Sequence, residues 1–395
     1  MNNNRNWEHK RIGDVCTVER GGSPRPIDSF ITDDPDGINW IKIGDTDDSM
    51  FITRTAQKII PEGMKKSRYV QPGDFLLSNS MSFGRPYILK IDGCIHDGWL
   101  VLRDNDNTFD KRFLYYYLSA KPTYEKFKRM AVGGVVNNLN SEMVRNVDVP
   151  LPKLEEQSSI ADLLDKLNLI ICARTKELKH LDELIKARFV EMFGNPVKNT
   201  MGWETKPLGS LATKIGSGAT PKGGKESYRE DGISLIRSMN VRNAEFDYKD
   251  LAHISDEQAS KLDNVIIEEN DVLLNITGAS VARSCIAPDD VLPARVNQHV
   301  CIIRCRNYID PIFLNRLLTD DNYQDLLWGI AGSGATREAI TKQQVESLTI
   351  ITPQRELQES FAQFVAQVDK SKVVVQKALD EAQLLFDSLM QEYFG

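Results

Sequence analysis

Glycine and lysine residues between positions 216 and 225 have types and spacing close to those of nucleotide-binding loops. A phosphate-binding loop requires Gly-x4-Gly followed at once by Lys and Ser or Thr. Gly218 and Gly223 have this separation, but the lysine comes one position late, at Lys225. The pair Gly216-x-Gly218 ends in Thr220-Pro221 and lacks the glycine that opens a helix in a dinucleotide fold. The sequence therefore predicts no nucleotide site at this loop.

Metal binding and catalysis by the chain itself are not predicted either. The five histidines show neither His-x3-His nor His-Glu-x2-His spacing. Six cysteines are scattered, and the nearest pair, Cys301 and Cys305, lies in an apolar run, which favours reduced, buried thiols in a cytoplasmic protein. A base-methylating enzyme of this kind needs an Asn/Asp-Pro-Pro-aromatic tetrapeptide, and Asn195-Pro196-Val197 does not supply it.

The chain is organised around a stretch of about 40 residues that occurs twice. The first copy runs from Pro152 to Gly194 and the second from Pro353 to Gly395, at a constant offset of 201 residues. Both copies reach Gln at their sixth position and close with Glu-x-Phe-Gly. Apolar residues follow heptad spacing without internal Gly or later Pro, which predicts two helices of about 60 Å each.

Polar residues interrupt the apolar seam of both predicted helices, at Arg174, Arg188 and Lys372. Arg174 and Lys372 either fix the register of a helix pair or extend outward from a wider seam, and the second interpretation is preferred. Apolar residues outside the seam favour a surface that docks a partner: Leu163, Leu169, Ile170 and Leu184.

Each long helix follows a globular segment, and the two segments share one order of signals. Both begin with Trp-Glu, at Trp7 and Trp203, and continue into a glycine-rich loop that ends in Ser-Pro or Thr-Pro. In the first segment we expect a short helix or strand at 12–15, strands near 36–45, 75–78, 99–103 and 147–150, and a helix at 113–130. The frameworks agree while the loops differ, which indicates one scaffold carrying two different surfaces.

Composition sets further bounds. A chain of 395 residues with 41% apolar residues is long enough for two or three domains. The net charge of −7 argues against coating nucleic acid through bulk charge, but it permits a local basic face. No run approaches 18 apolar residues and no secretory leader is evident, so we expect a cytoplasmic protein that does not enter membranes.

Taken together, the doubled order of head and long helix resembles the DNA-specificity subunit of Type I restriction-modification systems. The resemblance covers essentially the whole chain and rests on the Trp-Glu starts, the Gly-x-(Ser/Thr)-Pro loops, Asn-Gln-His-Val at 297–300, and the Leu-Pro and Glu-Gln openings of the helices. The first half departs from this pattern at 96–99, where it has His-Asp-Gly-Trp.

This resemblance implies an α+β fold with two similar target recognition domains, residues 1–150 and 196–352. Long spacer helices at 151–195 and 353–395 would pair antiparallel as a coiled coil, related by a pseudo-two-fold internal repeat. Each domain would read one half of a bipartite double-stranded DNA target. Two methyltransferase subunits would dock on the helices, and restriction/translocase subunits would join them. The chain itself would be non-catalytic, with S-adenosylmethionine, ATP and Mg bound by its partners.

Two other functions stay open. The chain could serve a related modification-only or Type II-like system, in which the reading logic is the same and the partner differs. It could also be a coiled-coil scaffold that does not bind DNA.

If the chain reads DNA, the readers are expected among Arg, Lys, Asn and hydroxyl side chains in the glycine-flanked loops, because such groups reach base edges and phosphates. In the first head the candidates are Arg25, Lys42, Asn79, Ser80, Ser82, Arg85, Asn137 and Asn138. In the second head they are Lys222, Lys225, Arg237, Asn240, Arg242, Asn275, Thr277, Ser280, Arg283 and Arg337.

Two comparisons between the heads rank these candidates. Arg85 and Arg283 occupy equivalent places, which favours a shared phosphate or structural role. Positions that differ, such as Asn138 against Glu338, are better candidates for specificity.

Overall fold

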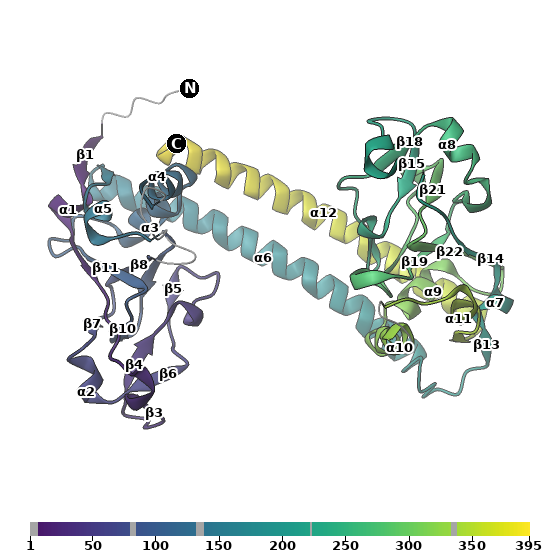
Figure 1. Cartoon of the computed structure of the whole chain (residues 1–395), viewed down its shortest axis with the longest axis horizontal. Coiled ribbons are helices and arrows are strands. Elements are labelled where there is room, and N and C mark those ends of the chain that lie inside the picture. Colours follow the sequence, from purple (N-terminus) through teal and green to yellow (C-terminus); the bar gives the residue numbers. More distant parts are fainter. Residues whose placement is uncertain (1–6, 80–83, 132–137, 222, 333–337) are drawn as a thin grey trace. The chain divides into compact units, whose positions relative to one another are not determined.

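The computed structural model of the chain describes residues 7–79, 84–131, 138–221, 223–332 and 338–395, except for the side chains of residues 225 and 227. It divides into two compact units, Met1–Thr175 with Lys377–Gly395, and Lys176–Gln376. Each unit holds one globular head and part of both long helices (Figure 1). We call the globular part of the first unit head 1 and that of the second head 2.

Head 1 is built from two five-stranded sheets, one two-stranded pair and short helices. The sheet orders are β2-β11-β8-β9-β5 and β3-β6-β4-β10-β7, and β1 pairs with β12. Its strands are β1 Glu8–Arg11, β2 Thr17–Arg20, β3 Ile31–Thr32, β4 Ile38–Ile41, β5 Phe51–Ile52, β6 Gln57–Ile59, β7 Arg68–Val70, β8 Phe75–Ser78, β9 Pro86–Leu89, β10 Gly93–Ile95, β11 Trp99–Arg103 and β12 Asp148–Leu151. Its helices are α1 Ile12–Val15, η1 Ile27–Ser29, η2 Ile43–Asp45, α2 Pro61–Met64, α3 Lys111–Ser119, α4 Lys121–Ala131 and α5 Ser141–Arg145.

Head 2 repeats this plan. Its sheets are β14-β22-β19-β20 and β18-β15-β21, with the pairs β13-β23 and β16-β17. Its strands are β13 Thr205–Pro207, β14 Ala212–Ser217, β15 Ile233–Ile236, β16 Val241–Arg242, β17 Glu245–Phe246, β18 Ala252–Ile254, β19 Val272–Asn275, β20 Ser284–Ile286, β21 Ala294–Val296, β22 Val300–Cys305 and β23 Thr349–Ile351. Its helices are α7 Leu208–Leu211, η3 Gly224–Ser227, η4 Ser238–Asn240, α8 Asp256–Ser260, η5 Asp263–Val265, η6 Gly278–Ser280, η7 Asp289–Val291, α9 Pro311–Leu318, α10 Asp321–Gly332 and α11 Lys342–Glu346.

The predicted mixed α+β fold class with an internal repeat is therefore confirmed. In both heads a strand that enters the head pairs with the last strand before a long helix, as β1 with β12 and β13 with β23. Both heads contain an equivalent parallel pair, β4 with β10 and β15 with β21, and head 1 has a further parallel pair, β5 with β9. Such agreement in pairing between two halves of one chain is what duplication of a module produces.

Two sequence expectations for head 1 were too long. The helix expected at 113–130 is two helices, α3 and α4, separated at Ala120, whose ψ of 140° is extended. Pro122 explains the break, because proline has no N–H to donate and is tolerated only in the first turn of a helix. The strand expected at 36–45 is only β4, Ile38–Ile41, after which the chain turns into η2.

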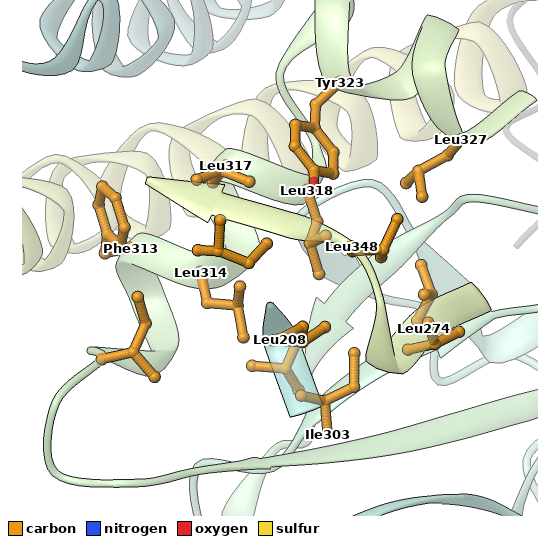
Figure 2. Packing of buried hydrophobic residues seen from close by; sticks show 14 of the residues in the cluster. Leu208, Leu274, Ile303, Phe313, Leu314, Leu317, Leu318, Tyr323, Leu327 and Leu348 are labelled. Atoms are coloured by element: carbon orange, nitrogen blue, oxygen red, sulfur yellow. The ribbon is translucent and has the colours of Figure 1, made fainter. Parts of the chain in front are cut away.

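The core of head 2 lies between its sheet and α9. Figure 2 shows Phe313, Leu314, Leu317 and Leu318 of α9 beside Leu274 and Ile303 of the strands. All six side chains are buried. The four from α9 lie at i, i+1, i+4 and i+5, which places them on one face of the helix. Head 1 has the same arrangement in α3, with Phe113, Leu114, Tyr117 and Leu118.

The two longest helices are α6, Leu154–Phe193, and α12, Arg355–Phe394 (Figure 1). The predicted heptad seam is confirmed by burial, since the seam residues Ile160, Leu164 and Leu167 of α6 and Phe361, Val365 and Val368 of α12 are buried. Near the end of α6 the buried positions move to Phe189 and Phe193, while Arg188, assigned to the seam, stays partly exposed. A helix with 3.6 residues per turn drifts away from a 3.5-residue repeat, which accounts for this shift.

The two helices run antiparallel, and each unit shows this separately. In the first unit Ile160 and Leu164, near the start of α6, share a core with Phe394 at the end of α12. In the second unit Phe189, near the end of α6, packs on Phe361, near the start of α12, with ring centroids 5.6 Å apart.

One polar seam residue makes a contact between the helices. Lys372 Nζ of α12 lies 2.6 Å from Asp182 Oδ1 of α6, and its side chain is 29% exposed. This ion pair favours the register-fixing interpretation for Lys372 over an outward extension. The apolar residues expected outside the seam are exposed, namely Leu163, Leu169, Ile170 and Leu184.

The expectation of buried cysteines holds for most of the chain and fails at one position. Cys16, Cys94, Cys285 and Cys301 are buried and Cys305 is partly buried, whereas Cys172 is exposed. Cys172 lies on the solvent-exposed face of α6, away from the seam.

A buried glutamine joins the start of each long helix to its head. Gln358 Oε1 accepts from Asp310 N–H at 2.8 Å, and its Nε2 donates to the carbonyl oxygens of Pro353 at 2.8 Å and Tyr308 at 3.4 Å. Gln157 makes the same three bonds in head 1, with Asp110 N–H at 2.9 Å and the carbonyls of residues 152 and 108 at 2.9 and 3.1 Å. Both side chains are buried, at 1% and 0% exposure. We call this arrangement the glutamine clasp.

Gln358→Leu is expected to lower the free energy of unfolding of the second unit by roughly 2–5 kcal/mol, because it leaves a buried N–H and two carbonyl groups without their partner. Urea unfolding of the whole chain measures this. Gln363→Leu is the matched control, since Gln363 is an exposed glutamine of the same helix. Equal unfolding midpoints for the two variants would show that the clasp does not hold the helix to the head.

Candidate nucleic-acid interface

The glycine-rich loop of each head lies against the turn between two strands. A Cβ on Gly21 would lie 2.1 Å from the His96 carbonyl oxygen, and one on Gly218 would lie 1.8 Å from that of Val296. Only glycine permits so close an approach of two backbones. Gly21 and Gly218 are therefore explained by packing inside the head.

The hydroxyl group of the same motif binds that turn in both heads. Ser23 Oγ donates to Asp97 Oδ1 at 2.7 Å, and Thr220 Oγ1 donates to Gln298 Oε1. The Ser23 hydroxyl is the main reason that the pKa of Asp97 lies below its usual value. Asp97 and Gln298 are equivalent positions, so one contact is kept with an aspartate in one head and a glutamine in the other.

The residues that precede Asp97 and Gln298, His96 and Asn297, also make the same hydrogen bond in both heads. His96 Nδ1 accepts from Gly98 N–H at 2.8 Å, and Asn297 Oδ1 accepts from His299 N–H at 3.0 Å. The segment at 96–99 that departs from the Asn-Gln-His-Val pattern is therefore its structural counterpart. The sequence set these segments opposite each other but did not show that a histidine nitrogen makes the same hydrogen bond as an asparagine oxygen.

A polar network extends from this turn in head 2. His299 Nδ1 lies 2.5 Å from Thr277 Oγ1, and His299 Nε2 lies 3.0 Å from Gln298 Nε2. Because Gln298 also accepts from Thr220, the network joins the glycine-rich loop to the loop after β19. His299 is thus held by side chains on both of its ring nitrogens.

Four of the candidate readers meet at one cavity of head 2, with a volume of about 610 Å³. They are Arg242, Thr277, Ser280 and Arg283. The other lining residues include Met239, His299 and Glu338, and Met239 is 40% exposed. We call this the head 2 cavity. Because it combines cationic, anionic, hydroxyl and apolar groups at the surface, it can bind a ligand that presents both donors and acceptors.

The two equivalent arginines, Arg85 and Arg283, have different surroundings. Their places agree, since Ser78 N–H donates to the Arg85 carbonyl at 3.0 Å and Asn275 N–H to the Arg283 carbonyl at 2.8 Å. The Arg85 guanidinium is bound by Asp48 Oδ1 at 3.1 Å and by the Asp47 carbonyl at 3.1 Å. Within the part of the chain that the structure describes, the Arg283 guanidinium has no ion-pair partner.

Other candidate readers are used inside the heads. Asn240 is fully buried and donates to the carbonyls of Asp247 and Lys249. Asn275 is also buried and donates to the Ser238 carbonyl at 2.8 Å, while Asn79 donates to the Asp97 carbonyl at 2.9 Å. These contacts give the three asparagines a framework role, and contact with DNA stays a prediction for them.

The remaining basic candidates are only partly committed. Arg25 is 84% exposed and lies 3.7 Å from Asp97, and Lys42 Nζ donates to Gln57 Oε1 at 2.8 Å. Arg242 pairs with Asp247 at 3.1 Å, and the pKa of Asp247 is lowered first by the Lys249 N–H and then by Arg242.

Arg237 packs over the Tyr228 ring, 5.2 Å from its centroid, and donates to the Asp250 carbonyl. It is partly exposed, and its Nε atom is buried without a recorded acceptor among the described residues.

The structure corrects the pairing of Asn138 with Glu338. Leu139 N–H donates to the Asn79 carbonyl at 3.0 Å, and Ile340 N–H donates to the Ile276 carbonyl at 2.8 Å. These equivalent bonds place Asn138 opposite Ala339, one residue after Glu338. The two loops differ in composition, so their sequences do not fix this register, whereas the backbone hydrogen bonds do.

Several candidates lie outside the described residues: Ser80, Ser82, Asn137, Lys222 and Arg337. The side chain of Lys225 also lies outside them. Over the described ranges no cluster of three or more His, Cys, Asp or Glu side chains could hold a metal ion. Likewise, none of the helices in the described part combines the length and apolar character needed to cross a membrane.

A family model described as the Type I restriction modification DNA specificity domain matches this chain twice, over residues 4–181 and 201–382. The chain belongs to this family. It is 21% identical to the Type I restriction enzyme MjaVIII specificity subunit of Methanocaldococcus jannaschii, over 94% of this chain and 90% of that protein.

Solved structures share the fold of this family member. The Type I restriction-modification S subunit from M. genitalium matches with a TM-score of 0.63 and 16% identity, over 100% of this chain and 98% of that one. A chain from a structure on complex assembly and conformational transition of the type I R-M system matches with a TM-score of 0.59 and 18% identity, over 98% and 97%.

Two residues of the specificity-domain heads were not found by sequence reasoning. Met239 lines the head 2 cavity, and Gln324 of α10 donates to the Ala282 carbonyl at 2.8 Å, next to Arg283. Met239 lies in a turn between polar residues, and Gln324 lies on a helix far along the chain, so neither carried a local signal.

His96 predicts a pH dependence of stability in head 1. Burial is the main reason that its pKa is lowered, and Lys42 lowers it further. A neutral imidazole can accept from the Gly98 N–H, whereas a protonated ring cannot. The unfolded chain therefore binds this proton first. The stabilising effect is complete above a pH of about 6.5 and is lost as the pH falls through the lowered pKa, with a slope of up to about 1.4 kcal/mol per pH unit.

His96→Asn, which introduces the residue found at the equivalent position of head 2, is expected to reduce this slope. Urea unfolding between pH 5 and 8 measures it, with His180→Asn on an exposed face of α6 as the control. The interpretation fails if wild type and His96→Asn lose stability in parallel as the solution is acidified.

Proposed function

We propose that this chain selects the DNA sequence in a Type I restriction-modification complex, with each head reading one half of a bipartite target. The observation that carries the proposal is one framework built twice with different loop chemistry. The contacts Ser23–Asp97 and Thr220–Gln298 hold the same loop in the two heads, while neighbouring surface residues differ in charge. Two similar frameworks with dissimilar surfaces suit two different half-sites.

The long helices suit a spacer. Each is 40 residues long, and each contributes its start to one unit and its end to the other. The separation of the half-sites in the DNA would then depend on helix length. An interhelical ion pair such as Lys372–Asp182 would help to fix the register on which that length depends.

The exposed apolar residues of the helices support docking of other subunits. Leu169 is 69% exposed on α6, and Val373, Val374 and Leu384 are 70–72% exposed on α12. Apolar residues so exposed on a long helix favour a protein interface. The partners would be two methyltransferase subunits, joined by restriction/translocase subunits. The reactions would take place on those partners, which would bind S-adenosylmethionine, ATP and Mg, and the specificity chain itself would be non-catalytic.

Head exchange tests the independence of the two heads. Replacing residues 1–150 by the corresponding segment of another family member is expected to change one half of the methylated sequence and leave the other half unchanged. Methylome sequencing of a host that carries the partner genes reads both halves at once. Exchange of residues 196–352 is the reciprocal control. A single exchange that altered both halves would contradict independent reading.

A change of helix length tests the spacer. Inserting four residues after Thr175 in α6 and four after Gln376 in α12 adds about 6 Å to each helix, close to two base-pair steps. The gap between the half-sites is expected to lengthen while the half-sites themselves stay the same. An alanine-rich insertion is the cleanest, and insertion of seven residues in each helix is the matched variant that preserves the heptad spacing and adds about 10 Å, close to three base-pair steps. An unchanged gap in a complex that still methylates DNA would rule out the helices as its determinant.

A further inference from the structure

The head 2 cavity presents hydrogen-bond donors and an acceptor to the same space. Arg283 contributes a guanidinium, and Thr277 and Ser280 contribute hydroxyl groups. Glu338 is exposed and contributes a carboxylate, and Met239 contributes an apolar surface. The cavity is therefore not a purely basic site.

This composition distinguishes two possible DNA groups. A phosphate presents only acceptors and carries negative charge, so a carboxylate beside it would be unfavourable. The major-groove edge of a G·C pair presents two acceptors on guanine, N7 and O6, and one donor on cytosine, the N4 amino group. An arginine can donate to guanine N7 and O6, and a carboxylate can accept from the cytosine N4 amino group. The presence of Glu338 in the cavity thus favours a base-pair edge.

The arginine is held in place by residues outside the cavity. Gln324 Nε2 donates to the Ala282 carbonyl at 2.8 Å and to the Leu318 carbonyl at 2.6 Å, and its Oε1 accepts from Asn243 at 3.3 Å. Gln324 thereby ties the turn before Arg283 to α9 and to the residue after Arg242. A guanidinium whose backbone is anchored in this way loses less conformational freedom on binding.

The acceptor is anchored from the other side of the cavity. Gly278 N–H donates to the Glu338 carbonyl at 3.0 Å, and Thr277 forms an isolated bridge with Ala339. The Thr277 hydroxyl is itself held by His299. The backbone that carries the carboxylate is therefore joined to the loop that carries the hydroxyl groups.

Among the described residues of head 1, the arginine at the equivalent position is already paired. Its equivalent arginine, Arg85, is bound by Asp48 and lies over the Tyr87 ring at 5.4 Å. In head 2 the residue that corresponds to Tyr87 is Cys285, which is buried. Asp45 Oδ2 accepts from Lys42 N–H and Asn240 Oδ1 accepts from Arg237 N–H, so Arg242, two residues after Asn240, stands at the position of Asp47. The same loop position thus carries an internally paired arginine in one head and an available one in the other.

We propose that the head 2 cavity reads one G·C pair of its half-site, with Arg283 donating to guanine and Glu338 accepting from cytosine. Gln324 is a positioning residue for Arg283. Head 1 does not use Arg85 in this way. The proposal rests on the proposed function, because it assigns a specific base pair to one head of the specificity subunit.

The test is methylome sequencing of hosts that carry the partner genes with wild type, Arg283→Ala, Arg283→Lys or Glu338→Ala. The wild-type half-site that follows head 2 is expected to contain a required G·C pair. Both Arg283 variants should relax this one position, with a roughly ten- to hundredfold loss of discrimination, because lysine keeps the charge but lacks the two-pronged donor. Glu338→Ala should relax the same position, and the half-site of head 1 should not change.

Lys261→Ala is the matched control, since Lys261 is a basic residue of head 2 with a 70% exposed side chain that does not line the cavity. It should leave both half-sites unchanged. Assembly with the methyltransferase subunits and an unchanged unfolding temperature show that each variant is folded. If Arg283→Ala does not assemble, Arg283→Lys decides the question.

The other outcomes are informative in different ways. Uniformly weaker DNA binding with an intact consensus, and a salt dependence reduced by about one phosphate contact, would identify a phosphate site and overturn the proposal. An unchanged consensus in every variant would also overturn it. A wild-type complex with no preferred bipartite sequence would instead overturn the proposed function itself.

Discussion

The glutamine clasp is the constraint on which the rest of the structure depends. Gln157 and Gln358 are buried and satisfied only because each lies where the start of a long helix meets the N-terminal cap of α3 or α9. An aromatic residue from the end of the other long helix packs on the first turn of α3 or α9, next to this contact. Phe394 packs on Phe113 at 5.3 Å, and Phe193 packs on Phe313 at 4.7 Å. Each head therefore needs the start of one long helix and the end of the other, which requires the helices to run antiparallel.

This dependence explains which parts of the two heads can diverge. A buried polar contact can change its residues only if the replacement keeps the donors and acceptors satisfied. The phenol that binds the last strand of each head shows such a change. Tyr117 of α3 donates to the Asp148 carbonyl, whereas in head 2 Tyr323 of α10 donates to the Thr349 carbonyl at 3.0 Å. The hydroxyl group is kept while the helix that supplies it differs. Surface loops have no such requirement, so charge can reverse there at little cost in stability.

Much of the architecture could be predicted from sequence because repetition and period are properties of many residues at once. The offset of 201 residues and the heptad seam located α6 and α12 to within two residues of their ends. The drift of the buried face to Phe189 was missed, because a strict heptad ignores the 3.6-residue turn. The site was harder to predict. Arg85 and Arg283 are indistinguishable in a linear comparison, and only the position of Asp48 beside one of them separates their roles.

Internal pairing also decides how much of the positive charge of this chain is available to a ligand. Many arginines of this acidic chain neutralise carboxylates within the heads. Arg103 binds Glu19 and Asp74, and Arg304 binds Asp271, whose side chain is fully buried. Such arginines add to the count of positive residues but present little charge to a ligand, since their donors are occupied. The net charge of −7 therefore says little about the local potential at the head 2 cavity. What matters there is whether a guanidinium has an internal carboxylate within reach, and this is set by the tertiary packing that brings η4 and η6 to the same cavity as Arg283.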